Sequence, residues 1–136
     1  AFKDGTNNDI YAMRWDGSAW VNSGSDLYTK ITASGVISTK QDFDIAWEGT
    51  SGKGKISYAT GTTTGASTYT AGSGWAADTS PFNPALAVQW IRIAGSPNNN
   101  YIAVIMSAVA STNASDVYVD MWNGTNHSFL VTPSRS

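Results

Sequence analysis

The feature that most limits how this chain can fold is a hairpin pattern near its start that returns near its end. The first copy, residues 9–20, alternates β-forming and other residues and then turns at Asp16-Gly17. The second copy, residues 116–125, alternates in the same way and turns at Asn123-Gly124. Asp-Gly or Asn-Gly between alternating runs predicts a β-hairpin, here with a type I′ turn whose two central residues both have positive φ. The chain is therefore expected to be a repeat of hairpins.

A second internal repeat emerges when the sequence is displaced so that residue 43 falls on residue 91, a displacement that we call the repeat shift. The repeat shift lays residues 43–47 on 91–95 and the polar turn 50–52 on 98–100. Residues 67–75 form a weaker third copy of the opening hairpin, with Trp75 at the place of Trp20. The repeat is then about 50 residues long and consists of an inner and an outer hairpin. The apolar residues that the repeat shift superimposes are Phe43 on Ile91, Ile45 on Ile93, Ala46 on Ala94, Ile56 on Val104 and Tyr58 on Met106.

No segment carries a helical period of useful length, so the chain is expected to be all-β. Residues 84–88 are allowed one helical turn at most, because they follow Pro81 and begin with Pro84. Residues 26–41 are interpreted as a connection with some strand character. The deepest core is expected where two neighbouring apolar runs are covered on both faces, which points to Ile91, Ile93, Ile102, Val104 and Met106.

The charge balance excludes several classes of partner. The net charge is −2, the isoelectric point is about 5.0, and no cluster of Lys or Arg is present that could hold nucleic acid or anionic lipid. The longest apolar run, within residues 101–109, is too short to span a bilayer. The chain has no cysteine, which excludes disulfides and thiolate chemistry. A charged fraction of only 13% beside abundant Gly, Ser, Thr and Asn is typical of extracellular or cell-surface β proteins.

Acidic residues on one strand are the first candidates for a binding site. Asp42, Asp44 and Glu48 alternate with apolar residues, so their carboxylates are expected on one strand face, with neighbours about 7 Å apart. That spacing suits a pair of glycosidase carboxylates, a cation or a cluster of sugar hydroxyls. The alternative is that the charges keep the strand soluble. The repeat shift places Asp44 on Arg92, so these two are also expected to pair structurally.

The six tryptophans recur at corresponding places of the repeat, where they either pack between sheets or stack on sugar rings. The predicted ligand-binding set combines both kinds of residue: Asp42, Asp44, Trp47, Trp90 and Arg92. His127 is the only histidine and is expected at the surface of its hairpin. A single histidine and no cysteine leave little for a metal site or a Ser-His-Asp triad, so no cofactor, metal or catalytic residue is expected.

Three motifs together resemble the blades of bacterial extracellular repeat β-propellers, which are broadly similar to sialidase-like and kelch-like propellers. They read Asp-Ile-Tyr-Ala-x-x-Trp-Asp-Gly-Ser-x-Trp, Phe-Asp-Ile-Ala-Trp-Glu-x-x-Ser-Gly and Trp-Ile-Arg-Ile-Ala-x-x-Pro-Asn. The resemblance implies antiparallel four-stranded blades, with a partial blade at 8–41 and blades at 42–87 and 88–136. About two and a half blades are too few to close a ring. An open β-sandwich is the alternative architecture.

The expected function is a non-enzymatic extracellular or cell-surface module for adhesion or assembly. A half blade leaves an unpaired strand edge along residues 10–15, and such an edge is a template for another chain, so self-association is expected through Ile10, Tyr11, Met13 and Trp15. Two chains would close a ring, and open pairing would give a filament. The alternatives are a glycan-binding, lectin-like module and a glycoside hydrolase of sialidase-like type. The hydrolase would need clustered arginines, whereas this chain has only Arg14, Arg92 and Arg135, far apart.

Overall fold

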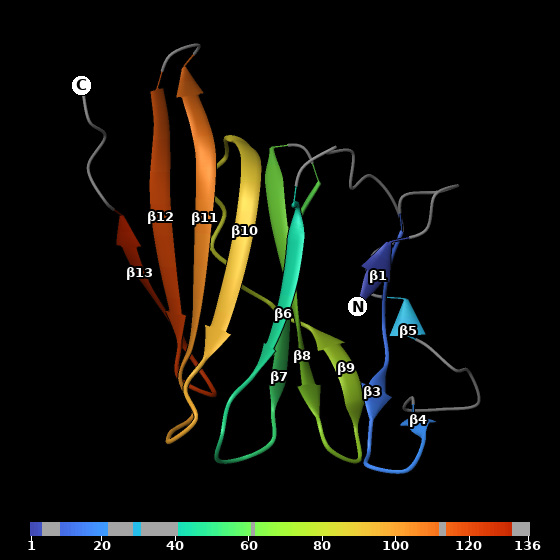
Figure 1. The fold of residues 1–136 in the computed structure, drawn as a ribbon. Helices are drawn as coiled ribbons and strands as arrows, with labels where there is room; N and C mark the ends of the chain where they lie inside the picture. The colour runs from blue at the N-terminus through green and yellow to red at the C-terminus, as the bar shows by residue number, and fades with distance from the viewer. Residues whose placement is uncertain (4–8, 22–28, 31–40, 61, 112–113, 132–136) are drawn as a thin grey trace.

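The computed structural model describes residues 1–3, 9–21, 29–30, 41–60, 62–111 and 114–131. These residues form β-strands joined by turns and loops, and none of them belongs to a helix that could cross a membrane. The predicted all-β, antiparallel and four-stranded architecture is confirmed, because two separate four-stranded antiparallel sheets follow one another along the chain. Neither sheet closes into a barrel (Figure 1).

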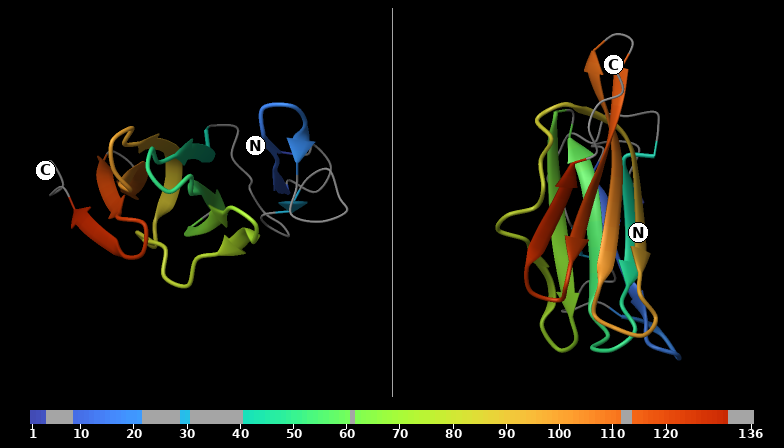
Figure 2. Two further views of the ribbon diagram at one scale, coloured as in Figure 1. Left: turned by 90° about the horizontal axis from the view of Figure 1, so that it is seen from below. Right: turned by 90° about the vertical axis from the view of Figure 1, so that its left-hand side faces the viewer.

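The strands fall into three groups: two four-stranded sheets, which we call the first sheet and the second sheet, and the N-terminal strands that precede them in the chain. The first sheet comprises β6 (Phe43–Trp47), β7 (Gly54–Thr60), β8 (Thr63–Thr70) and β9 (Gly74–Ala77). The second sheet comprises β10 (Ala87–Gly95), β11 (Ile102–Ser111), β12 (Ala114–Trp122) and β13 (His127–Val131). The N-terminal strands are β1 (Phe2–Lys3), β2 (Ile10–Ala12) and β5 (Thr29–Lys30) in one small sheet, and β3 (Arg14–Trp15) with β4 (Trp20–Val21) in a hairpin. The first sheet lies between the other two groups (Figures 1 and 2).

The two sheets share one strand register, which confirms the repeat shift in their inner hairpins. Phe43 pairs with Tyr58 across β6 and β7, and Ile91 pairs with Met106 across β10 and β11. The turns close alike as well. Glu48 N donates to Lys53 O at 3.1 Å, and at the equivalent place of the second sheet Ser96 N donates to Tyr101 O at 2.8 Å. Each sheet is therefore one copy of the same antiparallel unit.

The hairpin turns match one another but are not of type I′. Ala19 N donates to Asp16 Oδ1 at 2.9 Å in the first turn, and Asn126 N donates to Asn123 Oδ1 at 2.8 Å in the second. Gly17 and Gly124 have φ values of 108° and 92°, but neither Asp16 nor Asn123 has a positive φ. The predicted turn type was wrong because the Asp or Asn side chain caps a longer loop, which needs only one left-handed residue.

The two sheets stack face to face around an apolar cluster. Its buried members are Ala59 from the first sheet and Val88, Ile91, Val104, Met106, Ala108 and Tyr118 from the second. Along β11 buried and half-buried residues alternate, so among the described residues only one face of the second sheet is fully buried, and the prediction of a strand buried on both faces was wrong. Ile91, Ile102, Val104 and Met106 are buried as predicted. Ile93 is only partly buried, because it lies at the margin of the cluster beside Asp44.

The first strands of the two sheets, β6 and β10, lie side by side and form a seam (Figure 2). Ile91 N donates to Gln41 O at 2.9 Å at one end of the seam, and Gly49 N donates to Ser96 O at 2.8 Å at the other. Glycine is needed where the backbones meet, since a Cβ on Gly95 would lie 1.8 Å from Trp47 O. The seam fixes how one repeat sits on the next.

The N-terminal strands cover the other face of the first sheet. Ile10 and Ala12 are buried, and Ile10 packs with Ile56 in a second apolar cluster. The expectation that residues 10–15 form an open edge was wrong for β2, because β1 and β5 flank it on both sides. Part of the connection expected at 26–41 supplies β5, and its residues 26–28 and 31–40 lie outside the described residues.

Replacement of Val104 with Ala tests the apolar cluster. Val104 is fully buried between the two sheets, so we expect the variant to lose about 1–3 kcal/mol of unfolding free energy through removal of buried methyl groups. Chemical denaturation with the matched variant Val109→Ala, on the half-buried side of the same strand, measures the difference. An equal loss in both variants would contradict the assignment of the cluster.

Candidate functional site

The predicted ligand-binding residues lie along the seam rather than in one pocket. Arg92 Nη1 lies 3.8 Å from Asp44 Oδ2, which confirms the predicted pairing of these two side chains. The same Asp44 oxygen accepts a hydrogen bond from Ile93 N at 3.0 Å. Asp42 is buried just before β6, where its carbonyl accepts a hydrogen bond from Ala59 N at 2.8 Å. Asp44 therefore joins the two sheets through backbone and side-chain contacts.

The two predicted tryptophans of this set lie apart from one another. Trp47 is half-buried in an aromatic cluster, with its ring 5.9 Å from Trp75 and 6.3 Å from Tyr69. Trp90 is 37% exposed on the outer face of the second sheet, where the Arg92 guanidinium lies 5.6 Å from its ring. The aromatic residues serve packing in the first case and leave an exposed indole in the second.

The Glu48 carboxylate does not stand on the strand face but organises the turn after β6. It accepts hydrogen bonds from Thr50 N at 2.7 Å, Ser51 N at 2.9 Å and Lys53 N at 2.8 Å. The hydroxyls of Thr50 and Ser51 donate to the same carboxylate at 2.8 Å and 2.6 Å. Burial raises the pKa of Glu48, but the hydrogen bonds from Ser51 and Thr50 outweigh it and hold the pKa well below its ordinary value.

Replacement of Glu48 with Gln should change both stability and its dependence on pH. Loss of hydrogen bonds to a charged acceptor should remove about 1.5–3 kcal/mol of unfolding free energy near neutral pH. Because folding lowers the pKa of Glu48, the ionised group stabilises the fold above the unfolded value of 4.5, and this contribution is lost as the pH falls below it. The gap between wild type and variant should therefore narrow from about pH 7 to about pH 3 in urea titrations. A gap that does not depend on pH would contradict this role.

The densest group of polar side chains lies at the outer side of the interface between the sheets. The first sheet contributes Lys55 from β7 and Asp78, which follows β9 directly. The second sheet contributes Asp120 from β12 and His127 from the start of β13. We call these four residues the buried polar cluster. The Lys55 side chain is fully buried and the His127 side chain is 11% exposed, so the expectation of a surface histidine was wrong.

The four side chains form one chain of contacts across the interface. His127 Nδ1 lies 2.6 Å from Asp120 Oδ2, and His127 Nε2 lies 3.3 Å from Lys55 Nζ and 3.5 Å from Asp78 Oδ2. Lys55 also forms an ion pair with Asp78 Oδ2. Thr68 Oγ1 donates to Asp78 Oδ1 at 2.7 Å, and the Lys55 ammonium lies 4.9 Å from the Trp122 ring. This arrangement satisfies the buried lysine through a carboxylate, an imidazole and an aromatic ring.

Burial dominates the electrostatics of the buried polar cluster. It lowers the pKa of Lys55, against the opposing hydrogen bond and charge of Asp78. It also raises the pKa of Asp120, although the hydrogen bond from His127 and the charge of Lys55 act the other way. Asp120 Oδ1 is buried without a hydrogen-bond partner among the described residues. Both shifts show that removing the charges from water is only partly compensated by their pairing.

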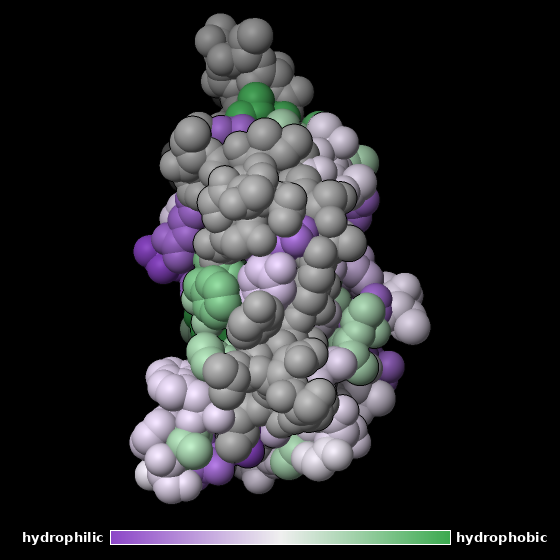
Figure 3. All heavy atoms as spheres, turned by 90° about the vertical axis from the view of Figure 1, so that its right-hand side faces the viewer, coloured by the Kyte–Doolittle hydropathy of each residue, from purple (hydrophilic) through white to green (hydrophobic). Residues whose placement is uncertain are grey.

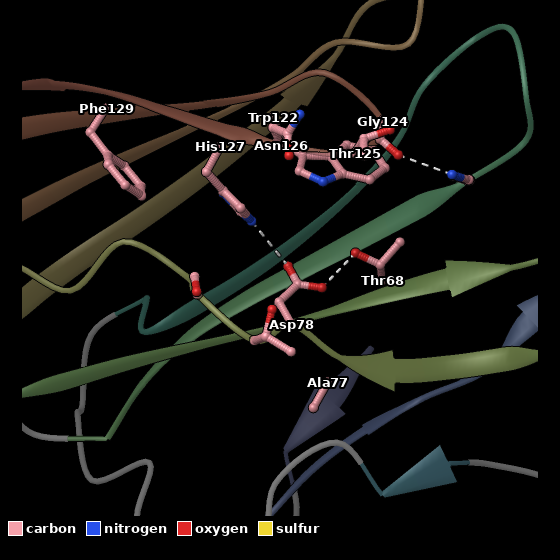
Figure 4. A pocket seen from close by; sticks show the side chains of 12 residues that line it. Thr68, Ala77, Asp78, Trp122, Gly124, Thr125, Asn126, His127 and Phe129 are labelled. Atoms are coloured by element: carbon pink, nitrogen blue, oxygen red, sulfur yellow. Dashed lines mark hydrogen bonds and ion pairs between the residues drawn. The ribbon is translucent and has the colours of Figure 1, made fainter.

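A pocket of about 530 Å³ opens above the buried polar cluster (Figure 4). Its floor includes Asp78, Trp122 and His127, and Figure 4 shows the His127 ring pointing toward Asp78. Lys53 stands at the pocket and donates to Gly124 O at 3.0 Å. The other lining residues are Thr68, Ala77, Thr79, Ser80, Gly124, Thr125, Asn126 and Phe129. Hydroxyl, amide and carboxylate groups thus face one another across the two sheets.

The chemistry available in this pocket is hydrogen bonding. No group of three or more His, Asp or Glu side chains that could hold a metal ion is present in the part of the chain that the structure describes. The His127 imidazole has both nitrogens occupied, one by Asp120 and one by Lys55. The pocket presents hydrogen-bond donors and acceptors to a ligand.

One feature of the sequence, separate from the repeat motifs, could have indicated that His127 has a specific partner. In the strand register, His127 faces Trp122 across the hairpin, as Trp20 faces Trp15 and Trp75 faces Tyr69. His127 thus occupies the position that an aromatic residue takes in the other copies. A polar residue at an otherwise apolar position of a repeat indicates a specific partner, which here is Asp120 on the same sheet. Lys55 gave no such signal, because its burial depends on the arrival of the second sheet.

Comparisons of the chain with protein-family models, with curated proteins and with solved structures found no match.

Proposed function

We propose that this chain is a non-enzymatic, extracellular β-repeat module that works by assembling with further copies of itself. In this proposal the two sheets are blades of an incomplete β-propeller-like array, and a second copy continues the stack. One observation carries the proposal. The outer side of the second sheet is apolar, and it corresponds in the repeat to the side of the first sheet that the second sheet covers.

The outer face of the second sheet consists of residues that alternate with the buried ones. Ile105 pairs with Arg92 on one side and with Val119 on the other, so these three side chains stand in one row. Ile105 and Val119 are half-buried and Trp90 on the same face is exposed. Among the described residues, both the apolar cluster and the Phe82 and Leu86 side chains that pack against it lie on the opposite face. We call the surface of Trp90, Ile105 and Val119 the outer face.

The internal repeat indicates what covers the outer face. When the repeat shift is applied in reverse, Arg92 and Ile105 of the second sheet correspond to Asp44 and Ser57 of the first sheet. Asp44 and Ser57 lie on the face that the second sheet covers. There Asp44 bonds to Ile93 N, and neighbouring Ala59 joins the apolar cluster. The outer face is more apolar than this covered equivalent, and a partly exposed apolar sheet face indicates an interaction site. A repeat unit of a second copy is the occupant that matches its geometry.

The partner surface is expected at the opposite end of a second copy, where the N-terminal strands lie. Figure 3 looks onto this end and shows apolar side chains among polar ones. Trp15 and Trp20 are 51% and 56% exposed there, with their rings 5.6 Å apart. Contact between unlike ends is heterologous, so it closes a ring or continues as a filament. The low charge of the chain favours either outcome, because little repulsion opposes the contact.

Light scattering over a concentration series tests the proposal. We expect the wild type to exceed the mass of one chain at micromolar concentration, and Ile105→Lys to return to that mass, because a buried lysine in the contact would be desolvated without a partner. Thr125→Lys is the matched control, since it adds the same charge at an exposed hairpin turn of the same sheet. A wild type that remains monomeric at every concentration would overturn the proposal, as would equal effects of the two lysines.

A further inference from the structure

The residues that line the pocket above the buried polar cluster have no role in the proposed assembly. It lies between the outer strands of the two sheets, whereas the proposed contact uses the outer face of the second sheet. Its lining comes from two repeats at once, with Thr68 and Asp78 from the first and Asn126 and His127 from the second. A ligand placed there would touch both repeats.

The charges around the pocket cancel. Lys53 and Lys55 contribute two positive charges, and Asp78 and Asp120 contribute two negative ones. His127 Nδ1 lies 2.6 Å from Asp120 Oδ2, and His127 Nε2 lies 3.3 Å from Lys55 Nζ and 3.5 Å from Asp78 Oδ2, so both ring nitrogens face partners within the cluster. Both lysines are already engaged, Lys55 with Asp78 and Lys53 with Gly124 O. Among the lining residues that the structure describes, the site therefore offers no free cation for a phosphate or carboxylate ligand and no surplus anion for a cationic one.

The remaining groups are donors and acceptors of hydrogen bonds beside one exposed ring. Thr79, Ser80 and Thr125 present hydroxyls and Asn126 presents an amide, all at exposed positions. Phe129 is 46% exposed, and its ring stacks on His127 at a centroid distance of 6.0 Å. A pocket of about 530 Å³ lies in the range of small-molecule sites, roughly 300–1,000 Å³. Flat apolar surface next to several hydroxyl-binding groups fits a ligand with one apolar face and many hydroxyls.

From these observations we infer that the pocket between the two sheets binds a neutral sugar of monosaccharide size, with Asp78 and Asn126 bonding its hydroxyls and Phe129 against its ring. Asp78 can accept from a sugar hydroxyl in addition to Thr68 and Lys55, since a carboxylate has about four lone-pair sites. The buried polar cluster then has a second role: it fixes the Asp78 carboxylate in position and keeps its charge balanced. Sugar binding is independent of the proposed assembly, so either can fail alone.

Titration of the ¹⁵N-labelled protein with the methyl glycosides of glucose, galactose, mannose and N-acetylglucosamine tests the inference. We expect amide shifts confined to residues 77–80 and 124–129 for at least one of these sugars. Asn126→Ala and Phe129→Ala should each weaken binding by about five- to tenfold, the effect of losing about 1 kcal/mol from one hydrogen bond or one ring contact. Both side chains are exposed, so neither variant should unfold the protein.

Tyr101→Ala is the matched control, because this 45% exposed aromatic residue lies in the turn between β10 and β11 and belongs neither to the pocket nor to the proposed contact. It should leave the titration unchanged. Three results would overturn the inference: no shift with any of the four glycosides, shifts that map to the Trp15 and Trp20 hairpin, or binding that survives both pocket variants.

Discussion

Replacement of Lys55 with Met is expected to lower the unfolding free energy by about 3–5 kcal/mol, which is the usual effect of removing one partner of a buried ion pair. The Lys55 side chain is fully buried and is paired with Asp78, while Asp120 lies near enough for its charge to act on it. Methionine has a similar length and fills the space, so the loss would come from charge rather than from a cavity. Urea denaturation followed by tryptophan fluorescence measures the change.

Two further variants separate this effect from a general loss of lysine. Lys53→Met removes a half-buried lysine two positions away that donates to one carbonyl, and it should lose no more than about 1 kcal/mol. The double variant Lys55→Met with Asp78→Leu removes both charges of the pair and should recover much of the lost stability. Equal losses for Lys53→Met and Lys55→Met would contradict the central place of Lys55.

Replacement of Gly95 with Val should destabilise the protein by about 3 kcal/mol or more, because it forces the seam between β6 and β10 apart. A Cβ at Gly95 would lie 1.8 Å from Trp47 O and 2.6 Å from the carbonyl carbon of Trp47. Those atoms belong to the backbone and cannot move aside as a side chain end would. The adjacent hydrogen bond from Gly49 N to Ser96 O would be lost with the displacement.

Ala94→Val is the matched control for this variant. It adds two methyl groups at the neighbouring position of the same strand, where the side chain is exposed. It should change the melting temperature little, whereas Gly95→Val should lower it strongly. If the two variants melted alike, the close approach of the strands at the seam would be contradicted.

The sequence predicted the repeat well because the repeat rests on local signals. Alternating residues and polar turns gave the strand ladders, and the repeat shift located Arg92 beside Asp44. The turn type was missed because the same Asp-Gly and Asn-Gly pairs serve both a two-residue turn and a longer, side-chain-capped loop. Local chemistry thus predicts that the chain turns, but not how many residues it uses.

The buried polar cluster was beyond prediction because it is made by contacts distant in sequence. Lys55 stands 72 residues before His127, and although the repeat places His127 at an aromatic position, no local pattern marks Lys55 as buried. The same holds for β2, which looked like an open edge until β1 and β5 were placed beside it. In both cases the outcome depends on which elements meet across the fold, and hydrophobic periodicity does not encode that information.

Energy transfer between two singly labelled proteins tests the assembly of repeat on repeat most directly. The chain has no cysteine, so Ser107→Cys on the outer face and Ala19→Cys in the N-terminal hairpin turn each provide one labelling site. A donor at position 107 mixed with an acceptor at position 19 on a different copy should give transfer that rises with concentration and disappears in Ile105→Lys. Transfer that is absent while the mixed sample remains monomeric by light scattering would contradict the account.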